Sequence, residues 1–133
     1  MQPLTLYALT AVIFLLADMV MLRVVMQPLF QKYLGDWLLD PIRIGPAVGF
    51  YLAYVAGLVW LVSWPAYRAD APQMALFNGA ILGAVAYGTY EFTNYATLTR
   101  WTITQVVVDG LWGTVATGLA AWAGVVILRA IFS

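Results

Sequence analysis

The chain contains no cysteine and no histidine among its 133 residues. Without thiols it can form neither disulfide bonds nor thiolate nucleophiles. Without imidazole it lacks the ligand of His-bound haem and of most zinc and copper sites. Any chemistry must therefore come from carboxylates, tyrosines, amides, hydroxyls or arginine, and the sequence gives no sign of a cofactor.

Charge is also scarce, since 9% of the residues are charged, 64% are hydrophobic and the formal net charge is zero. A soluble domain carries about 25% charged residues, so this chain cannot cover a water-facing surface. The sequence has no basic tract, which argues against nucleic acid as a partner. Membrane lipids are the expected surroundings.

Four long apolar stretches account for nearly the whole chain. A membrane-crossing helix needs about 20 apolar residues, and such stretches occupy about residues 4–25, 45–64, 73–94 and 103–131. The first is too long for the apolar region of a cleaved signal peptide, which has about 7–15 residues. We therefore predict one all-α domain over residues 1–133, a four-helix transmembrane bundle.

The connection between the first two stretches, residues 27–43, mixes charged side chains with apolar and aromatic ones. Tyr33 and Trp37 suit the depth of lipid head groups, so the segment is predicted to be an amphipathic connection at the interface. An ordinary loop is the alternative. Residues 65–72 and 97–102 form the two shorter connections.

Small residues recur at helical spacing in the last two stretches. They allow helices to approach closely where lipid provides no hydrophobic drive between them. We expect tight packing within the chain, while pairing of two copies through Gly79 and Gly83, or contact with another membrane protein, stays open. The small residues are Gly79, Gly83, Gly110, Gly113, Thr114, Thr117 and Gly118.

The basic residues predict an orientation. With four spans, both termini share one side of the membrane with Arg68 and Arg129. Cytoplasmic loops carry the excess of Lys and Arg, so the termini are predicted on the outer side. The four basic residues expected on the opposite side are Arg23, Lys32, Arg43 and Arg100.

Three acidic residues, Asp18, Glu91 and Asp109, lie inside the apolar stretches. A charge there costs about 2.5–3.5 kcal/mol. At about 1.5 Å per helical residue, all three lie nearer to the side of the first and third connections. Further polar and aromatic side chains reach the same layer. The predicted binding pocket consists of Asp18, Tyr51, Tyr54, Tyr87, Tyr90, Glu91, Thr93, Asn94, Asp109 and Trp112.

Two interpretations of this layer are open. One is a structural brace in which protonated Asp18 donates to a carbonyl or tyrosine and Asp109 pairs with Arg23 or Arg100. Because polar contacts between spans contribute only about 0.6 kcal/mol on average, three acids with four tyrosines exceed what a brace needs. We prefer a functional pocket, which holds at least one proton at neutral pH because burial and neighbouring carboxylates disfavour ionisation.

The strings YGTYEFTNYATLTRW (residues 87–101) and VVDGLWG (107–113), with ADMVML around Asp18, carry a family resemblance. The chain resembles a family of small four-span bacterial inner-membrane proteins classified only as a domain of unknown function, family 2177 of that series. The resemblance implies a bacterial cytoplasmic membrane and no established activity. The chain departs from the pattern of this family at two positions. Glu91 stands where the family usually has Asp, and Met21 stands where it usually has Trp.

Three functions fit these residues. The preferred one is binding of a small cation, a proton or a lipid head group, because tyrosine rings and carboxylates both attract cations. An enzyme acting on a lipid or isoprenoid is an alternative, with Glu91 or Asp109 as general base, Tyr90 as acid and Asp18 as a further candidate. A non-catalytic assembly subunit is the third. Carboxylates and Asn94 would suit Mg²⁺ or Ca²⁺, but no spacing motif supports a metal site.

Overall fold

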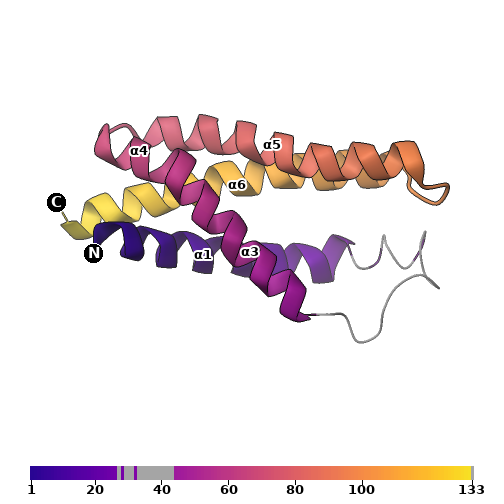
Figure 1. Cartoon of the computed structure of the whole chain (residues 1–133), viewed down its shortest axis with the longest axis horizontal. Helices are drawn as coiled ribbons and strands as arrows, with labels where there is room; N and C mark the ends of the chain where they lie inside the picture. Colours follow the sequence, from indigo (N-terminus) through magenta and orange to yellow (C-terminus); the bar gives the residue numbers. More distant parts are fainter. Residues whose placement is uncertain (27, 29–31, 33–43, 133) are drawn as a thin grey trace.

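The computed structural model describes residues 1–26, 28, 32 and 44–132, and within them it contains helices and turns and no strand (Figure 1). The all-α prediction and the four-helix bundle are confirmed. The predicted amphipathic connection, residues 27–43, lies outside the described residues except for Pro28 and Lys32. The helical segments are α1 (Gln2–Met21), η1 (Leu22–Met26), α3 (Ile44–Leu58), η3 (Val59–Ser63), α4 (Trp64–Arg68), α5 (Pro72–Thr97) and α6 (Ile103–Phe132).

Within the part of the chain that the structure describes, three long helical segments are apolar enough by themselves to cross a membrane: Gln2–Val25, Gly45–Arg68 and Ile103–Phe132. The fourth, α5, has the length for a span with 26 residues. Its second half contains the polar string YGTYEFTN, which makes it less apolar than the others. Since α5 packs most extensively against α6, part of this polar surface faces protein instead of lipid.

The second span is longer than the sequence predicted, because α3, η3 and α4 continue one another to Arg68 instead of ending at Trp64. Pro65 lies inside this span and has no N–H to donate to the carbonyl of Leu61, one turn earlier. Around Leu61 the chain forms the wider π-helical turn η3, in which Trp64 N–H bonds to the carbonyl of Val59. Local π-helical adjustment is a usual way to accommodate such a missing donor.

Glycines set the close approach of α5 and α6. A Cβ atom on Gly83 would collide with the carbonyl oxygen of Gly113, and one on Gly113 would collide with the ring of Tyr87. Gly79 is likewise in close contact with Gly118. Gly79, Gly83, Gly113 and Gly118 therefore pack within the chain, whereas nothing lies within 4 Å of a Cβ added to Gly110.

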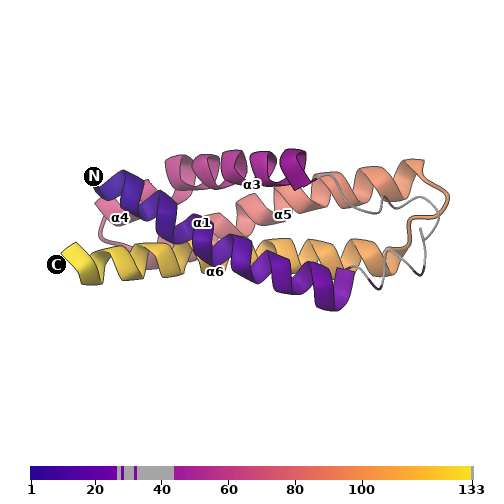
Figure 2. The same cartoon turned by 90° about the horizontal axis from the view of Figure 1, so that it is seen from below.

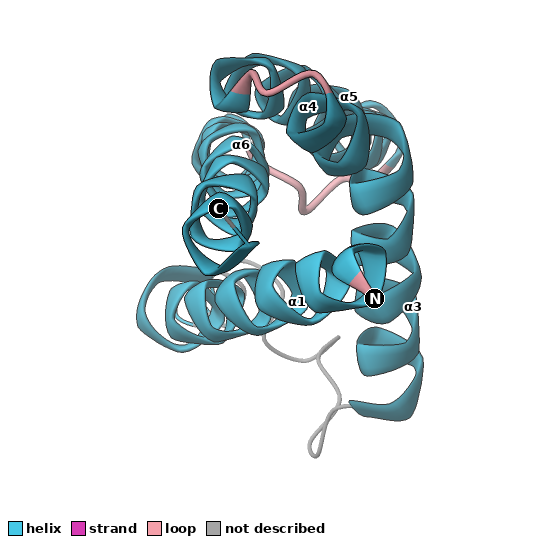
Figure 3. Ribbon diagram, turned by 90° about the vertical axis from the view of Figure 1, so that its left-hand side faces the viewer, coloured by secondary structure: helices cyan, strands magenta, loops and turns pink. Residues whose placement is uncertain are grey.

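Seen from the end that carries both termini, α6 lies between α5 and α1, and α3 crosses on the opposite side (Figure 3). In the side views α3 runs obliquely across α1 instead of parallel to it (Figures 1 and 2). Near the chain termini, η3 contacts α1, α5 and α6. The oblique path of α3 separates its first half from α5 and makes room for a cavity.

Candidate functional site

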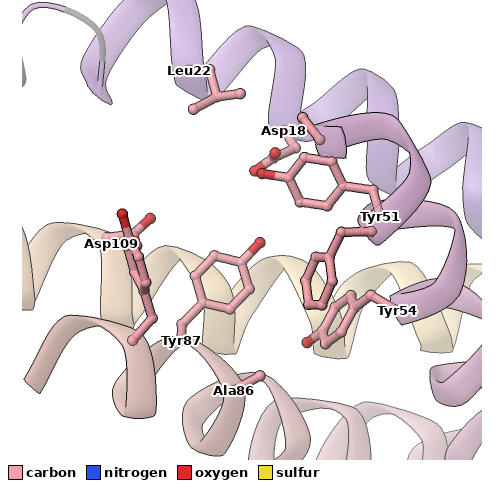
Figure 4. Close-up of a pocket in the computed structure, with 10 residues that line it drawn as sticks. Asp18, Leu22, Tyr51, Tyr54, Ala86, Tyr87 and Asp109 are labelled. Carbon is pink, nitrogen blue, oxygen red and sulfur yellow. The ribbon is translucent and has the colours of Figure 1, made fainter. Parts of the chain in front are cut away.

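A cavity of about 350 Å³ lies among α1, α3, α5 and α6 (Figure 4). Helix α3 supplies four of the ten lining residues, the largest share of any helix, and both acids of the lining come from other helices. The mouth of the cavity is partly open. The lining consists of Asp18, Leu22, Ala47, Phe50, Tyr51, Tyr54, Ala86, Tyr87, Tyr90 and Asp109.

Asp18 on α1 is the most enclosed acid of this lining, with 4% of its surface exposed. Its Oδ1 accepts a hydrogen bond of 3.1 Å from the indole N–H of Trp112 on α6. Its Oδ2 has no hydrogen-bond partner among the described residues. The Tyr51 hydroxyl lies beside this carboxyl (Figure 4). Asp18 thus presents a buried acceptor oxygen to the cavity.

Aromatic rings form a continuous wall beside Asp18. Phe50 packs against Tyr51 and Tyr54, with ring centroids 6.4 and 6.3 Å apart, and Tyr54 meets Tyr87 edge-on at 6.3 Å. The Tyr54 hydroxyl is held by the Thr117 hydroxyl at 2.9 Å. The buried hydroxyl of Tyr87 has no partner among the described residues and points into the cavity (Figure 4).

Asp109 on α6 lines the cavity opposite Asp18, and Glu91 on α5 lies behind it. Glu91 is fully buried, and its Oε1 accepts a hydrogen bond of 2.8 Å from the indole N–H of Trp101. Asp109 has both Glu91 and Asp18 as electrostatic neighbours. The three acids that the sequence placed in one layer are therefore brought together, but only two of them face the cavity.

The predicted pocket and the observed lining overlap in part. Glu91 stands behind the cavity and Trp112 supports Asp18 from outside. Thr93 is exposed on the outer side of α5 and, like half-buried Asn94, does not line the cavity. The six predicted residues that line it are Asp18, Tyr51, Tyr54, Tyr87, Tyr90 and Asp109.

Sequence reasoning missed the apolar part of the wall and the partner of Glu91. Phe50 and Ala47 look like any lipid-facing side chains, and no sequence signal distinguishes them. Trp101 lies in the predicted short connection 97–102, but it is 7% exposed and packs edge-on against Tyr90. The signal available in the sequence was Trp101, an aromatic N–H donor ten residues after Glu91.

The acids are not arranged as a metal centre, since within residues 1–26, 28, 32 and 44–132 no three acidic side chains surround a common point suited to a metal ion. Asp109 and Asp18 approach the cavity from different helices (Figure 4).

The sequence matches the family described as Predicted membrane protein (DUF2177) over residues 3–126. The chain belongs to this family. The resemblance noted from its motifs is thereby confirmed, and the chain is a membrane protein. No curated protein and no solved structure matches it, so the family establishes a membrane location and leaves the activity to be argued from the site.

Proposed function

We propose that this protein binds the ammonium head group of a membrane amphiphile in the cavity between α1, α3, α5 and α6. The observation that carries the proposal is the buried, unpartnered Oδ2 of Asp18 within an aromatic wall. A carboxylate oxygen that is shielded from water favours a cation strongly, because leaving it unpaired costs free energy.

The aromatic wall favours an organic cation over a bare metal ion. Phe50 and Tyr51, Tyr54, Tyr87 and Tyr90 together present five rings to the cavity. The faces of such rings attract cations, and clusters of them are the usual receptors for quaternary ammonium groups. Methylated ammonium also has apolar surface, which matches walls that offer more carbon than oxygen.

The size and depth of the cavity favour a head group attached to a chain. At about 350 Å³ it lies at the lower end of ligand sites, which occupy about 300–1,000 Å³. Asp109 is the seventh residue of α6, about 9 Å from the start of the helix. A cavity at this depth suits a lipid head group whose chain leaves through the partly open mouth.

The remaining expectations about location complete the proposal. The family resemblance supports a bacterial cytoplasmic membrane, and charge supports termini on the outer side. At the end of the molecule that carries the termini, Arg129 pairs with Asp70 at 2.8 Å, which reduces the positive charge of that end further. Membrane lipids are the proposed partners. Pairing of two copies of the chain, or contact with another membrane protein, stays open.

The test measures the thermal stability of the purified protein in lipid nanodiscs with three amphiphiles of equal chain length. Hexadecyltrimethylammonium is expected to raise Tm, while hexadecyl sulfate and hexadecanol are not. Tetramethylammonium, which lacks the chain, distinguishes a free head group from an attached one. Asp18→Asn and Asp109→Asn are expected to lose the response.

Asp70→Asn serves as the matched control, because Asp70 is an exposed acid far from the cavity. It should retain the full response to hexadecyltrimethylammonium. Equal shifts with ammonium and sulfate, or unchanged shifts in both cavity variants, would contradict the proposal. A response to Na⁺ or Mg²⁺ without any amphiphile would favour a small-cation site in its place.

A further inference from the structure

Asn78 is an exposed amide in the first half of α5, which lies at one edge of the bundle (Figure 3). Its apolar neighbours Phe77 and Ile81 are also exposed, by 66% and 62%, so lipid surrounds this face of a single copy. In the part of the chain that the structure describes, the Asn78 side chain has no hydrogen-bond partner. A carboxamide that faces hydrocarbon without a partner is costly, so this surface needs an explanation.

The contacts of the next residue place Asn78 near the middle of the membrane. Gly79 packs against Gly118, the sixteenth of the 30 residues of α6. Beside Gly118, the Thr117 hydroxyl is hydrogen-bonded to Tyr54, which lies near the middle of the span Gly45–Arg68. Two spans thus agree on the depth of this layer. Since half of the hydrocarbon core is about 15 Å thick, the short side chain of Asn78 cannot reach the head groups.

The residues that follow Asn78 along the same face form an uncharged seam. Ile81, Val85, Gly88 and Phe92 come after it at alternating steps of three and four, the spacing by which one helix packs along another. Val85 and Phe92 are exposed. Among the described residues, a Cβ atom added to Gly88 would meet only the ring of Phe92 on its own helix. Gly88 and Phe92 also line a groove of about 290 Å³ between α5 and α6, so a further helix can approach closely here.

We propose that two copies of this chain pair in the membrane through the outer seam of α5, which consists of Asn78, Ile81, Val85, Gly88 and Phe92. Copies inserted in the same orientation are related by a two-fold axis along the membrane normal, so each residue lies at the same depth in both. Asn78 therefore meets the partner subunit's Asn78. An amide both donates and accepts, so two identical amides satisfy each other, and such hydrogen bonds join helices in lipid.

A second copy explains this surface better than other occupants. Acyl chains cover apolar side chains but offer no hydrogen bond to an amide, and a different protein would need a polar group at the same depth. The interface also differs from the pairing through Gly79 and Gly83 that the sequence left open, because α6 occupies both glycines. It uses none of the residues that line the cavity, so it does not depend on the proposed ammonium site.

Energy transfer between donor- and acceptor-labelled protein in liposomes, measured over a range of protein-to-lipid ratios, gives the association constant. Wild-type protein is expected to form dimers. Asn78→Leu should weaken association about 3- to 20-fold, the range for an interhelical hydrogen bond, while Asn78→Gln keeps an amide and should retain most of it. Gln73→Leu is the matched control, because Gln73 is an exposed amide of the same helix, about 140° round from Asn78. Monomeric wild-type protein at every ratio, or equal losses in Asn78→Leu and Gln73→Leu, would overturn the inference.

Cross-linking in native membranes locates the interface, since the chain has no cysteine of its own. With copper phenanthroline as oxidant, Val85→Cys is expected to form a disulfide-linked dimer, because the two-fold axis places this seam position opposite its own copy. Val12→Cys, which is 57% exposed but lies on α1, should stay monomeric. Dimers of Val12→Cys without dimers of Val85→Cys would place the contact on α1 and contradict the seam, as would cross-linking of Val85→Cys only to a different protein.

Discussion

At the residue scale, two tryptophans hold the buried acids. Trp112 donates to Asp18 and Trp101 donates to Glu91, at 3.1 and 2.8 Å. In each case the indole belongs to another part of the chain and its apolar body fits the bundle while its N–H meets the carboxyl. These two hydrogen bonds orient the acids within the membrane, although neither acid has a basic partner on its own helix.

We predict that Trp101→Phe lowers the free energy of unfolding by about 1–3 kcal/mol, the range for a hydrogen bond to a charged or buried acceptor. Trp112→Phe should cost less, because its hydrogen bond to Asp18 is longer, at 3.1 Å. Reversible unfolding in mixed detergent micelles, followed by circular dichroism, provides the measurement. Trp60→Phe is the matched control, since Trp60 is 78% exposed, and a loss of equal size there would remove the argument.

At the element scale, the π-helical segment η1 and the glycines of α5 and α6 shape the cavity. η1 and η3 both end two residues before a proline, Pro28 and Pro65. Because proline has no N–H, the carbonyl four residues earlier, on the third residue of each segment, lacks its usual helical donor. η1 brings Leu22 into the cavity lining. The glycine contacts of α6 determine how closely Tyr87 approaches, so packing of this helix pair sets one wall of the site.

Gly113→Ala and Gly110→Ala form a matched pair one helical turn apart on α6. Gly113→Ala is expected to destabilise the protein by about 1–3 kcal/mol, because its Cβ meets the Tyr87 ring and overpacks the interface. Gly110 has nothing within 4 Å of the added atom, so Gly110→Ala should be neutral or stabilise by up to about 1 kcal/mol through helix propensity. Melting temperatures in one detergent compare them directly, and equal losses would show that the interface is not as close as described.

At the scale of the whole molecule, both termini and the turn between α4 and α5 lie at one end of the bundle, and the turn between α5 and α6 lies at the other (Figure 1). The first turn closes with Asp70 in the left-handed region, at φ 55°, and with Ala71 N–H bonded to the Ala66 carbonyl at 3.0 Å. This pattern of a helix end fixes α4 against α5, and the Asp70 ion pair with Arg129 ties it to α6. The two ends of the bundle therefore differ in their charged residues and in the turns that they contain.

Because the chain has no cysteine, single cysteines can report its orientation. We expect Ala69→Cys, in the α4–α5 turn, to react with a membrane-impermeant maleimide added to intact cells. Thr99→Cys, in the α5–α6 turn, should react only after the membrane is permeabilised, because the proposed orientation places that turn in the cytoplasm. Both positions are exposed, so access to reagent is the only variable, and the reverse labelling pattern would invert the orientation.

Sequence by itself determined that this chain belongs in a membrane, and it predicted the depth of its acids. Composition excluded a water-facing surface, four apolar stretches of the right length required helices, and the family motifs confirmed a membrane protein. The layer of Asp18, Glu91 and Asp109 was predictable because helical rise is constant, so sequence position converts directly into depth.

Tertiary structure decided which side chains face one another, because rotation and tilt of each helix are set by packing against its neighbours. The oblique path of α3 turned Phe50 and Tyr51 into a cavity wall, and the glycine contact at Gly113 placed Tyr87 beside it. The same rotations put Glu91 behind Asp109 and turned Thr93 outward. Depth follows from counting residues along one helix, whereas facing depends on contacts between residues far apart in the chain, which no single stretch of sequence contains.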